Sequence, residues 1–313
     1  MRLKIDLAAV LFGKAGAKMN TGLKRKICKT GLTLILALLA LIFIAPLALT
    51  VTNSLMSEPE IRSNYEMVGS DAAAATAGEA PVFANLKLIP DIVTLKQYYT
   101  VLFRRLQFLY MFWNSVLLVL PIVAGQLLVA SMAAYAFAKI SFRGREKLFY
   151  LYIVVMLMPF QVTLVPNYLI AEKLGLTGSV LSIILPGIFS TFGVFLLRQF
   201  MVYIPDAYSE AARVEGAGHW TVFTRIALPM TKTGLAALTI LVFIDNWNMV
   251  EQPLIFLQDA GKQPLSVFLA EINAGERGIA FAASVIYMVP MLLVFLYGED
   301  YLVQGIQLSG IKG

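Results

Sequence analysis

The sequence has 313 residues, of which 59% are hydrophobic and only 14% are charged. Soluble domains contain about 45–50% apolar and about 25% charged residues, so this composition excludes a soluble globular protein and indicates an integral membrane protein. The net charge is +6, and the single cysteine, Cys28, excludes an internal disulfide.

A basic tail opens the chain. Residues 1–29 contain eight Lys or Arg residues and one acid, Asp6. Basic segments beside a first membrane span remain on the cytoplasmic side. We therefore predict a cytoplasmic tail that fixes the first span with its N-terminus inside, and we expect no nucleic-acid partner.

Six apolar stretches follow that are long enough to cross a bilayer, which needs about 20 apolar residues in helical conformation. They lie roughly at residues 30–51, 111–138, 148–170, 180–200, 230–257 and 279–303. Prolines within the third, fourth and sixth stretches predict bent helices. The sequence therefore predicts an all-α integral membrane protein with six transmembrane helices.

The distribution of basic residues tests this topology. Under an arrangement with the N-terminus inside, the cytoplasmic segments are 1–29, 139–147, 198–232 and the C-terminal tail, and they hold 17 of the 25 Lys and Arg residues. The longer outside loops hold the other eight. This bias places both termini in the cytoplasm.

Five segments follow from this reading. We predict a basic tail at 1–29, a first transmembrane helix at 30–52, an external loop at 53–110, a membrane core at 111–303 and a cytoplasmic tail at 304–313. The division near residue 110 separates an anchor helix and its loop from a core of five spans.

The most informative segment is the cytoplasmic loop 205–229, whose residues 210–229 read EAARVEGAGHWTVFTRIALP. We expect a helix that begins near Asp206, whose carboxylate caps the first backbone N–H groups, and that presents one face made of Tyr208, Ala211, Ala212 and Glu215. Gly216 ends this helix, because glycine accepts the left-handed conformation found at helix ends. A second short helix then runs to Pro229, and the result is a rigid elbow between two spans.

This loop resembles the EAA loop of permease subunits in ATP-binding-cassette importers, with a Glu-Ala-Ala triplet, a spaced glycine and an Ile-x-Leu-Pro ending. The resemblance implies that the loop docks onto a separate ATPase and carries its motion into the membrane. The coupling residues that it implies are Glu210, Ala211, Ala212, Glu215, Gly216, Ile226, Leu228 and Pro229. The family often has Asp at position 215, and Glu keeps the charge.

The chain has no nucleotide site of its own. The phosphate-binding pattern Gly-x4-Gly-Lys-Ser/Thr is absent from the sequence, as are paired zinc motifs and nucleophile elbows. His219 is the single histidine and cannot form a metal site alone. We therefore expect a transport subunit and not an enzyme, with no cofactor and no metal bound by this chain, and with ATP and magnesium used by a partner ATPase.

Two further segments narrow the resemblance. Residues 243–257 (FIDNWNMVEQPLIFL) and 301–313 (YLVQGIQLSGIKG) resemble the second permease of maltose-type carbohydrate importers. That resemblance implies the transmembrane fold of a type I ABC importer. It also implies a second contact with the ATPase, made by the tail residues Gly305, Gly310, Lys312 and Gly313.

The most polar group within any span is the run Asp245, Asn246, Trp247 and Asn248. Ionisable residues at membrane depth usually face a cavity or a partner, and amides beside an aromatic ring suit a sugar. Consecutive positions point in different directions around a helix, so hydrogen bonding between helices is an equal alternative to a solute pathway. The maltose-type resemblance implies that the following loop, 258–278, protrudes into a solute-binding protein, and Gly261, Pro264 and Gly275 are compatible with such a loop.

The sequence thus favours a permease subunit that imports a carbohydrate across the bacterial cell (inner) membrane by alternating access. Its expected partners are a second homologous permease, two cytoplasmic ATPase subunits, an extracytoplasmic solute-binding protein and membrane lipid. A polyol, a glycerol phosphoester or an acidic oligosaccharide is an alternative cargo. An ion-coupled secondary transporter is the alternative of a different class; it would rely on Asp245 and would leave the elbow unexplained.

Overall fold

The computed structural model describes residues 21–65, 85–271 and 276–310, and helices make up most of these ranges. The predicted all-α class is confirmed: within this part of the chain, strand pairing is limited to one isolated bridge. The chain divides into two compact units, Met1–Val93 and Thr94–Gly313. This boundary comes before the division predicted near residue 110, because short helices α4 (Lys96–Tyr99) and η2 (Thr100–Arg104) already belong to the second unit.

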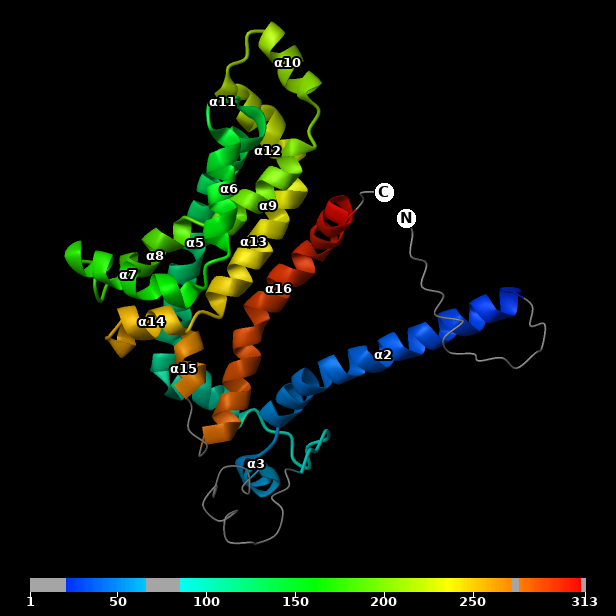
Figure 1. Ribbon diagram of the computed structural model, residues 1–313. Helices are drawn as coiled ribbons and strands as arrows, with labels where there is room; N and C mark the ends of the chain where they lie inside the picture. The colour runs from blue at the N-terminus through cyan, green and yellow to red at the C-terminus, as the bar shows by residue number, and fades with distance from the viewer. Residues whose placement is uncertain (1–20, 66–84, 272–275, 311–313) are drawn as a thin grey trace. The chain divides into compact units, whose positions relative to one another are not determined.

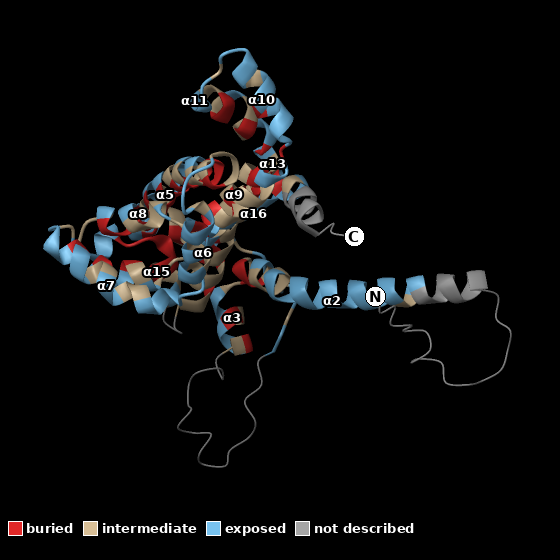
Figure 2. Cartoon of the chain, turned by 45° about the horizontal axis from the view of Figure 1, so that its top comes forward, coloured by how far each residue is buried: buried red, intermediate tan, exposed pale blue. Residues whose placement is uncertain are grey.

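The first unit contains one long apolar helix, α2 (Thr21–Ser54), followed by the short α3 (Glu58–Tyr65). Large apolar side chains of α2 are exposed from Leu32 to Val51, and Figure 2 shows this helix in the colour of exposed residues. At about 1.5 Å per residue this stretch is about 30 Å long, which matches the hydrocarbon core of a bilayer. The first predicted span is therefore present, and its helix begins within the predicted tail, at Thr21.

Four long segments run alongside one another in the second unit: α5 (Leu106–Lys139), α9 (Thr191–Val202), α13 (Lys232–Trp247) and α16 (Arg277–Gly310) (Figure 1). Glycines allow these helices to approach closely. A Cβ atom added at Gly234 of α13 would lie 2.7 Å from Cγ of Phe200 in α9. Small residues at helix interfaces are typical of membrane proteins, where packing replaces the hydrophobic effect.

The third predicted span, 148–170, is not one helix. It is divided into α6 (Arg145–Met156) and α7 (Phe160–Lys173), which are bent by 100°. Pro159 lies at the break, where it lacks a backbone N–H and disfavours helical conformation in the residue before it. The fourth span is likewise interrupted between α8 (Leu181–Ile188) and α9, two residues after Pro186.

Four helical segments of the described chain are long and apolar enough to cross a membrane. The number rises to six if each of two bent pairs of helices counts as one span. The first pair is α6 with α7, and the second is His219–Met230 with α13, which are bent by 75°. The predicted fifth span, 230–257, is shorter in the structure, since α13 ends at Trp247. Asn248 follows, and its amide donates to the Ile244 carbonyl (2.8 Å), which competes with continued helix.

Short helices gather at the two ends of the bundle (Figure 1). At one end α9 is joined to α13 by α10 (Asp206–Val214), α11 (His219–Val222), the π-helical η3 (Phe223–Ala227) and α12 (Leu228–Met230). At the opposite end α13 is joined to α16 through α14 (Glu251–Phe256), η4 (Ala260–Lys262) and α15 (Leu265–Glu271).

The connection at the α15 end is hydrogen-bonded to α5. Asn114 of α5 donates through Nδ2 to the carbonyls of Gly261 (2.7 Å) and Gln263 (3.1 Å), and the Ser115 hydroxyl accepts from the backbone N–H of Leu265 (2.8 Å). Pro264 is buried. Residues 261–265 are therefore held by α5, residues 258–262 are exposed, and Gly275 lies outside the described residues, so the protruding loop stays a prediction.

Candidate functional site: the elbow between α9 and α13

We call residues 205–229 the elbow. It begins at Pro205, which takes the N-cap position of α10 with φ −59° and ψ 134°. The predicted cap by Asp206 is wrong, because Asp206 is the first helical residue and its side chain makes no capping bond. Its carboxylate accepts instead from Nζ of Lys139, at 2.7 Å. A carboxylate in the first turn still complements the helix dipole.

The end of α10 follows the prediction made for Gly216. Gly216 has φ +85°, in the left-handed region that favours glycine. Its N–H donates to the Arg213 carbonyl (2.9 Å), and the N–H of Ala217 donates to the Ala212 carbonyl (2.9 Å). These two bonds form a Schellman motif, which satisfies carbonyls that the helix end would otherwise leave unpaired. The chain therefore turns sharply at Gly216 and with defined geometry.

The elbow turns most of α10 outward, as Figure 2 shows. Ser209 is buried and Ala212 is partly buried, whereas Glu210, Ala211 and Glu215 are exposed. Large apolar groups are also exposed here: Val214 has 90% of its surface accessible, and Tyr208 and Trp220 are more than half accessible. Exposed aromatic and large apolar side chains that lie close together are typical of a protein-binding site.

The second half of the elbow is fixed to the bundle. Val222, Phe223 and Ala227 are buried, and the Phe223 ring lies 5.2 Å from the ring of Tyr135 in α5. Two predicted coupling residues, Ile226 and Leu228, pack partly against the same core, and Pro229 is exposed at the start of α12. The eight predicted coupling residues therefore divide between an outward helix and an anchored one.

A single lysine connects the elbow to α5. Lys139 is the last residue of α5, its side chain is only 6% exposed, and its Nζ donates to the Ile204 carbonyl (2.5 Å) as well as to Asp206. The Lys139 ammonium lowers the pKa of the Asp206 carboxyl below its ordinary value of 3.8, first through the hydrogen bond and then through its charge. A carboxyl whose pKa is lowered on folding stabilises the folded state at pH values above the pKa that it has in the unfolded state. The contribution of Asp206 is therefore complete at neutral pH. It is lost as the pH falls below 3.8 through the lowered pKa.

Lys139→Met should uncouple the elbow from α5. The substitution removes the donor of the Ile204 carbonyl and the partner of Asp206, while the methionine keeps most of the side-chain volume. We expect a several-fold fall in transport at neutral pH with normal insertion, measured as uptake per molecule in membrane vesicles. Lys147→Met, at an exposed lysine near the start of α6, is the matched control. Equal uptake by the two variants would contradict a role for Lys139 in holding the elbow.

The polar run at the end of α13 points in two directions. Asp245 and Asn248 are exposed, as is Leu241 one turn earlier, so that these three residues share one face of the helix. Asn246 donates to the Val242 carbonyl of its own helix (2.8 Å).

Trp247 lies on the opposite side, 1% exposed, and its Nε1 donates to the Tyr287 carbonyl at 3.2 Å. Its ring lies 5.3 Å from that of Phe243 and 5.8 Å from that of Tyr287. In this structure Trp247 therefore connects helices, and the exposed candidates for a solute pathway are Asp245 and Asn248.

Three residues at these sites were missed by sequence reasoning. Lys139 was counted only as a basic residue of a cytoplasmic segment. Tyr287 donates its hydroxyl proton toward the Trp247 carbonyl (2.8 Å) and Asn248 Oδ1 (2.9 Å), and Phe112 packs edge-on against Trp247. Lys139, Tyr287 and Phe112 each lie far in the sequence from the residue that they contact, and no local sequence pattern indicates these contacts.

The predicted tail contact is only partly described. The helix α16 continues through Gly305 to Gly310, so the segment predicted as a tail from residue 304 begins as helix. Lys312 and Gly313 lie outside the described residues.

Comparison with known proteins gives a consistent result. The family model described as binding-protein-dependent transport system inner membrane component matches residues 99–307. The arabinooligosaccharides transport system permease protein AraQ of Halalkalibacterium halodurans is 32% identical over 205 residues, which cover 64% of this chain and 74% of that protein. The sn-glycerol-3-phosphate transport system permease protein UgpE of Pectobacterium atrosepticum is 31% identical over 201 residues, covering 63% and 72%.

A solved structure shares the fold. It is a chain from the crystal structure of a bacterial ABC transporter involved in the import of the acidic polysaccharide alginate. The TM-score is 0.72 at 21% sequence identity, and the match covers 91% of this chain and 99% of that one. The two chains therefore share their fold.

Proposed function

Because this chain belongs to the family of binding-protein-dependent transport system inner membrane components, we propose that it translocates a carbohydrate in an importer driven by a separate ATPase. The chain is a multi-pass inner-membrane permease of the sugar-transporter type and not an enzyme. The observation that carries the proposal is the elbow: a helix exposed to solvent, ended by a Schellman turn and fixed at both ends to spanning helices.

The elbow suits the transmission of force. Its outward helix offers Glu210, Ala211, Glu215 and the exposed Val214 to a partner surface. A pull on this helix passes along two routes. Lys139 carries it to α5, and the buried residues of η3 carry it to the base of α13. The close contact of Gly234 with Phe200 keeps α9 and α13 together at that base. ATP-driven closure of the ATPase would thus rotate these helices together.

The remaining partners follow from the same proposal. The bias of basic residues supports a cytoplasmic elbow with both termini on that side. A second homologous permease completes the pore, and two ATPase subunits bind ATP and magnesium in the cytoplasm. The family description supports delivery of the solute by a binding protein, which would dock outside. Gly305, Gly310, Lys312 and Gly313 are proposed to make the second contact with the ATPase.

A carbohydrate is the favoured cargo. The arabinooligosaccharide relative and the alginate importer both bear names that refer to sugars, and the exposed amide of Asn248 and carboxylate of Asp245 can form hydrogen bonds with hydroxyl groups. The glycerol-3-phosphate relative supports a phosphoester as the alternative cargo.

Asn248→Ala tests the solute pathway. The asparagine amide contacts Met291 Sδ (3.4 Å) and the Ile244 carbonyl, and its oxygen accepts from Tyr287. If Asn248 also binds solute, its loss should raise the KM for uptake several-fold without lowering the thermal stability of the protein. Tyr287→Phe is the matched control, because it removes one partner of Asn248 and leaves the amide in place. Loss of stability in Asn248→Ala with an unchanged KM would assign the residue to helix packing.

The proposal as a whole is tested by reconstitution. The chain is purified gently from its native membranes with its associated subunits and placed in liposomes, and uptake of sugars is measured with ATP inside or outside and with the binding protein present. We expect uptake that requires ATP on the elbow side and that ends when the ATPase subunit is removed. Uptake that persists without ATP and follows an ion gradient would establish the secondary-transporter alternative and direct attention to Asp245.

A further inference from the structure

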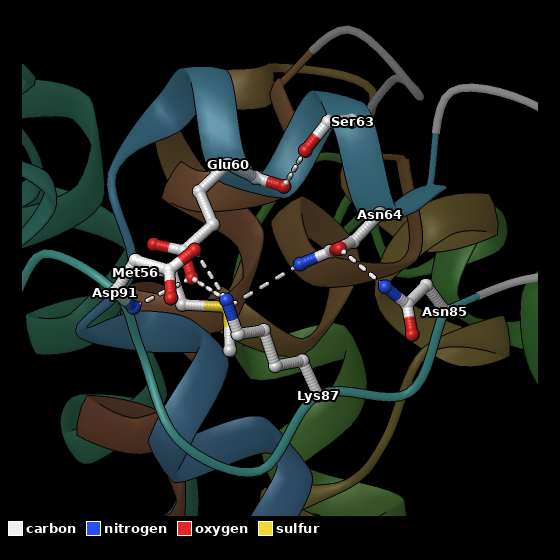
Figure 3. Close-up of polar contacts among 7 residues, drawn as sticks. All are labelled: Met56, Glu60, Ser63, Asn64, Asn85, Lys87 and Asp91. Atoms are coloured by element: carbon white, nitrogen blue, oxygen red, sulfur yellow. Dashed lines mark hydrogen bonds and ion pairs between the residues drawn. The ribbon is translucent and has the colours of Figure 1, made fainter.

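The first unit contains a segment whose charged side chains are paired and whose aliphatic side chains are exposed. We call residues 85–93 the strap, and it lies against α3 (Figure 3). Lys87 forms ion pairs with Glu60 of α3 (3.3 Å) and with Asp91 of the strap. The backbone N–H of Asp91 also donates to Glu60 Oε1 (2.8 Å), and the Glu60 side chain is only 8% exposed. The Lys87 charge is therefore neutralised by Glu60 of α3 and by Asp91, whose own side chain is 71% exposed.

The apolar side chains of the strap lie on its open side. They are 58–78% exposed: Leu86, Leu88, Ile89, Ile92 and Val93. A segment folded for water places such groups inside and leaves its charged groups outside. The strap exposes all five of these aliphatic side chains, and this arrangement is favourable where the surroundings are apolar.

The position of the strap identifies those surroundings. Met56, just beyond the end of α2, pairs with Val93 in an antiparallel bridge. The exposed apolar surface of α2 ends at Val51, so the bridge lies within roughly 10 Å of the edge of the hydrocarbon core. The headgroup layer beyond that edge is about 5–8 Å deep. The strap is thus continuous with the membrane surface of α2.

We propose that the strap is an interfacial membrane anchor. Its aliphatic side chains insert among the lipid headgroups and upper acyl chains of the leaflet at the Val51 end of α2, which is the outer leaflet in the proposed topology. Pro90 keeps the strap from continuing as a regular strand or helix, and the Lys87 and Asp91 charges remain paired above the lipid. Lipid is favoured over a protein partner because the apolar face begins where the spanning helix leaves the bilayer.

Spin labels at the strap test this anchor. In the full chain with Cys28→Ser, purified with its associated subunits and placed in lipid nanodiscs, a nitroxide is attached at Ile89→Cys or, separately, at Ile92→Cys. Ser63→Cys, on the exposed polar side of α3, is the control. Collision rates are measured with molecular oxygen, which partitions into lipid, and with a water-soluble nickel chelate.

We expect the ratio of oxygen to nickel collisions at positions 89 and 92 to exceed that at position 63 several-fold. Nickel accessibility equal to that at position 63 would show that the strap faces water and would overturn the proposal. Exclusion of both reagents would show that protein covers the strap, as a second permease or binding protein would, and would overturn it as well. Two strap positions guard against a single substitution that disturbs the fold.

Discussion

Gly216→Val should reduce ATP-driven uptake by about tenfold or more while the protein remains inserted at its normal level. The left-handed conformation at Gly216, φ +85°, costs an L-residue about 1–2 kcal/mol and is rarer still for a β-branched one. A Cβ atom there would meet nothing within 4 Å, so the effect comes from the backbone and not from a clash. Valine would open the Schellman turn and redirect α10, and about 1.4 kcal/mol corresponds to a tenfold change in rate.

Two controls isolate the backbone effect at Gly216. Gly216→Asn should retain most of the uptake, because asparagine tolerates the left-handed conformation. Gly218→Val places the same side chain two residues away, where φ is −76° and where again nothing lies within 4 Å. Uptake is measured in vesicles together with the amount of ATPase that co-purifies. Wild-type uptake by Gly216→Val would remove the elbow from the coupling mechanism.

Trp247→Ala should lower the stability of the protein more than any substitution in the elbow. Trp247 is buried among Phe112, Phe243 and Tyr287, and its N–H donates to a backbone carbonyl of α16. Truncation leaves a cavity between α5, α13 and α16 and removes the hydrogen bond from the indole N–H to the Tyr287 carbonyl. Such changes cost about 3–5 kcal/mol in protein cores. We expect a clear fall in Tm, measured by thermal unfolding in detergent, and a reduced yield of folded protein.

Trp220→Ala is the matched control for Trp247→Ala. The same substitution is made at a tryptophan that is 65% exposed on the elbow. It should leave the Tm nearly unchanged and weaken binding of the ATPase. Equal Tm values for wild type and Trp247→Ala would mean that Trp247 is not part of the helix packing, and the residue would return to the list of candidates for a solute pathway.

The features that the sequence could predict are those that depend on residues close together in the chain. The left-handed glycine at 216, the helix before it and the first span were all expected from residue types and spacing, because each depends on neighbours in the chain. The kink at Pro159 was expected too, although its size, which turns one predicted span into two helices, was not. The 100° bend depends on how α6 and α7 pack, and the position of a proline does not determine that.

Contacts between residues far apart in the sequence explain what the sequence could not predict. Asp206 was expected to cap a helix, but Lys139, far away in sequence, binds its carboxylate. The loop after α14 was expected to protrude, and the hydrogen bonds that Asn114 and Ser115 of α5 make with residues 261 and 265 were not expected. For residues 245–248 the sequence left a solute pathway and helix packing as equal alternatives, and the structure places Trp247 inward and Asn248 outward. In each case a local pattern left open which partner the tertiary structure supplies.

The central claim, that the elbow binds a separate ATPase, is tested most directly by crosslinking at Val214. This side chain is 90% exposed on the outward helix, so a photoreactive amino acid can replace it with little effect on folding. After irradiation of native membranes, the crosslinked species is isolated and its partner is identified by mass spectrometry. The account predicts a nucleotide-binding subunit, with a yield that changes when ATP is added. Crosslinks only to lipid, or only to another copy of this chain, would contradict it.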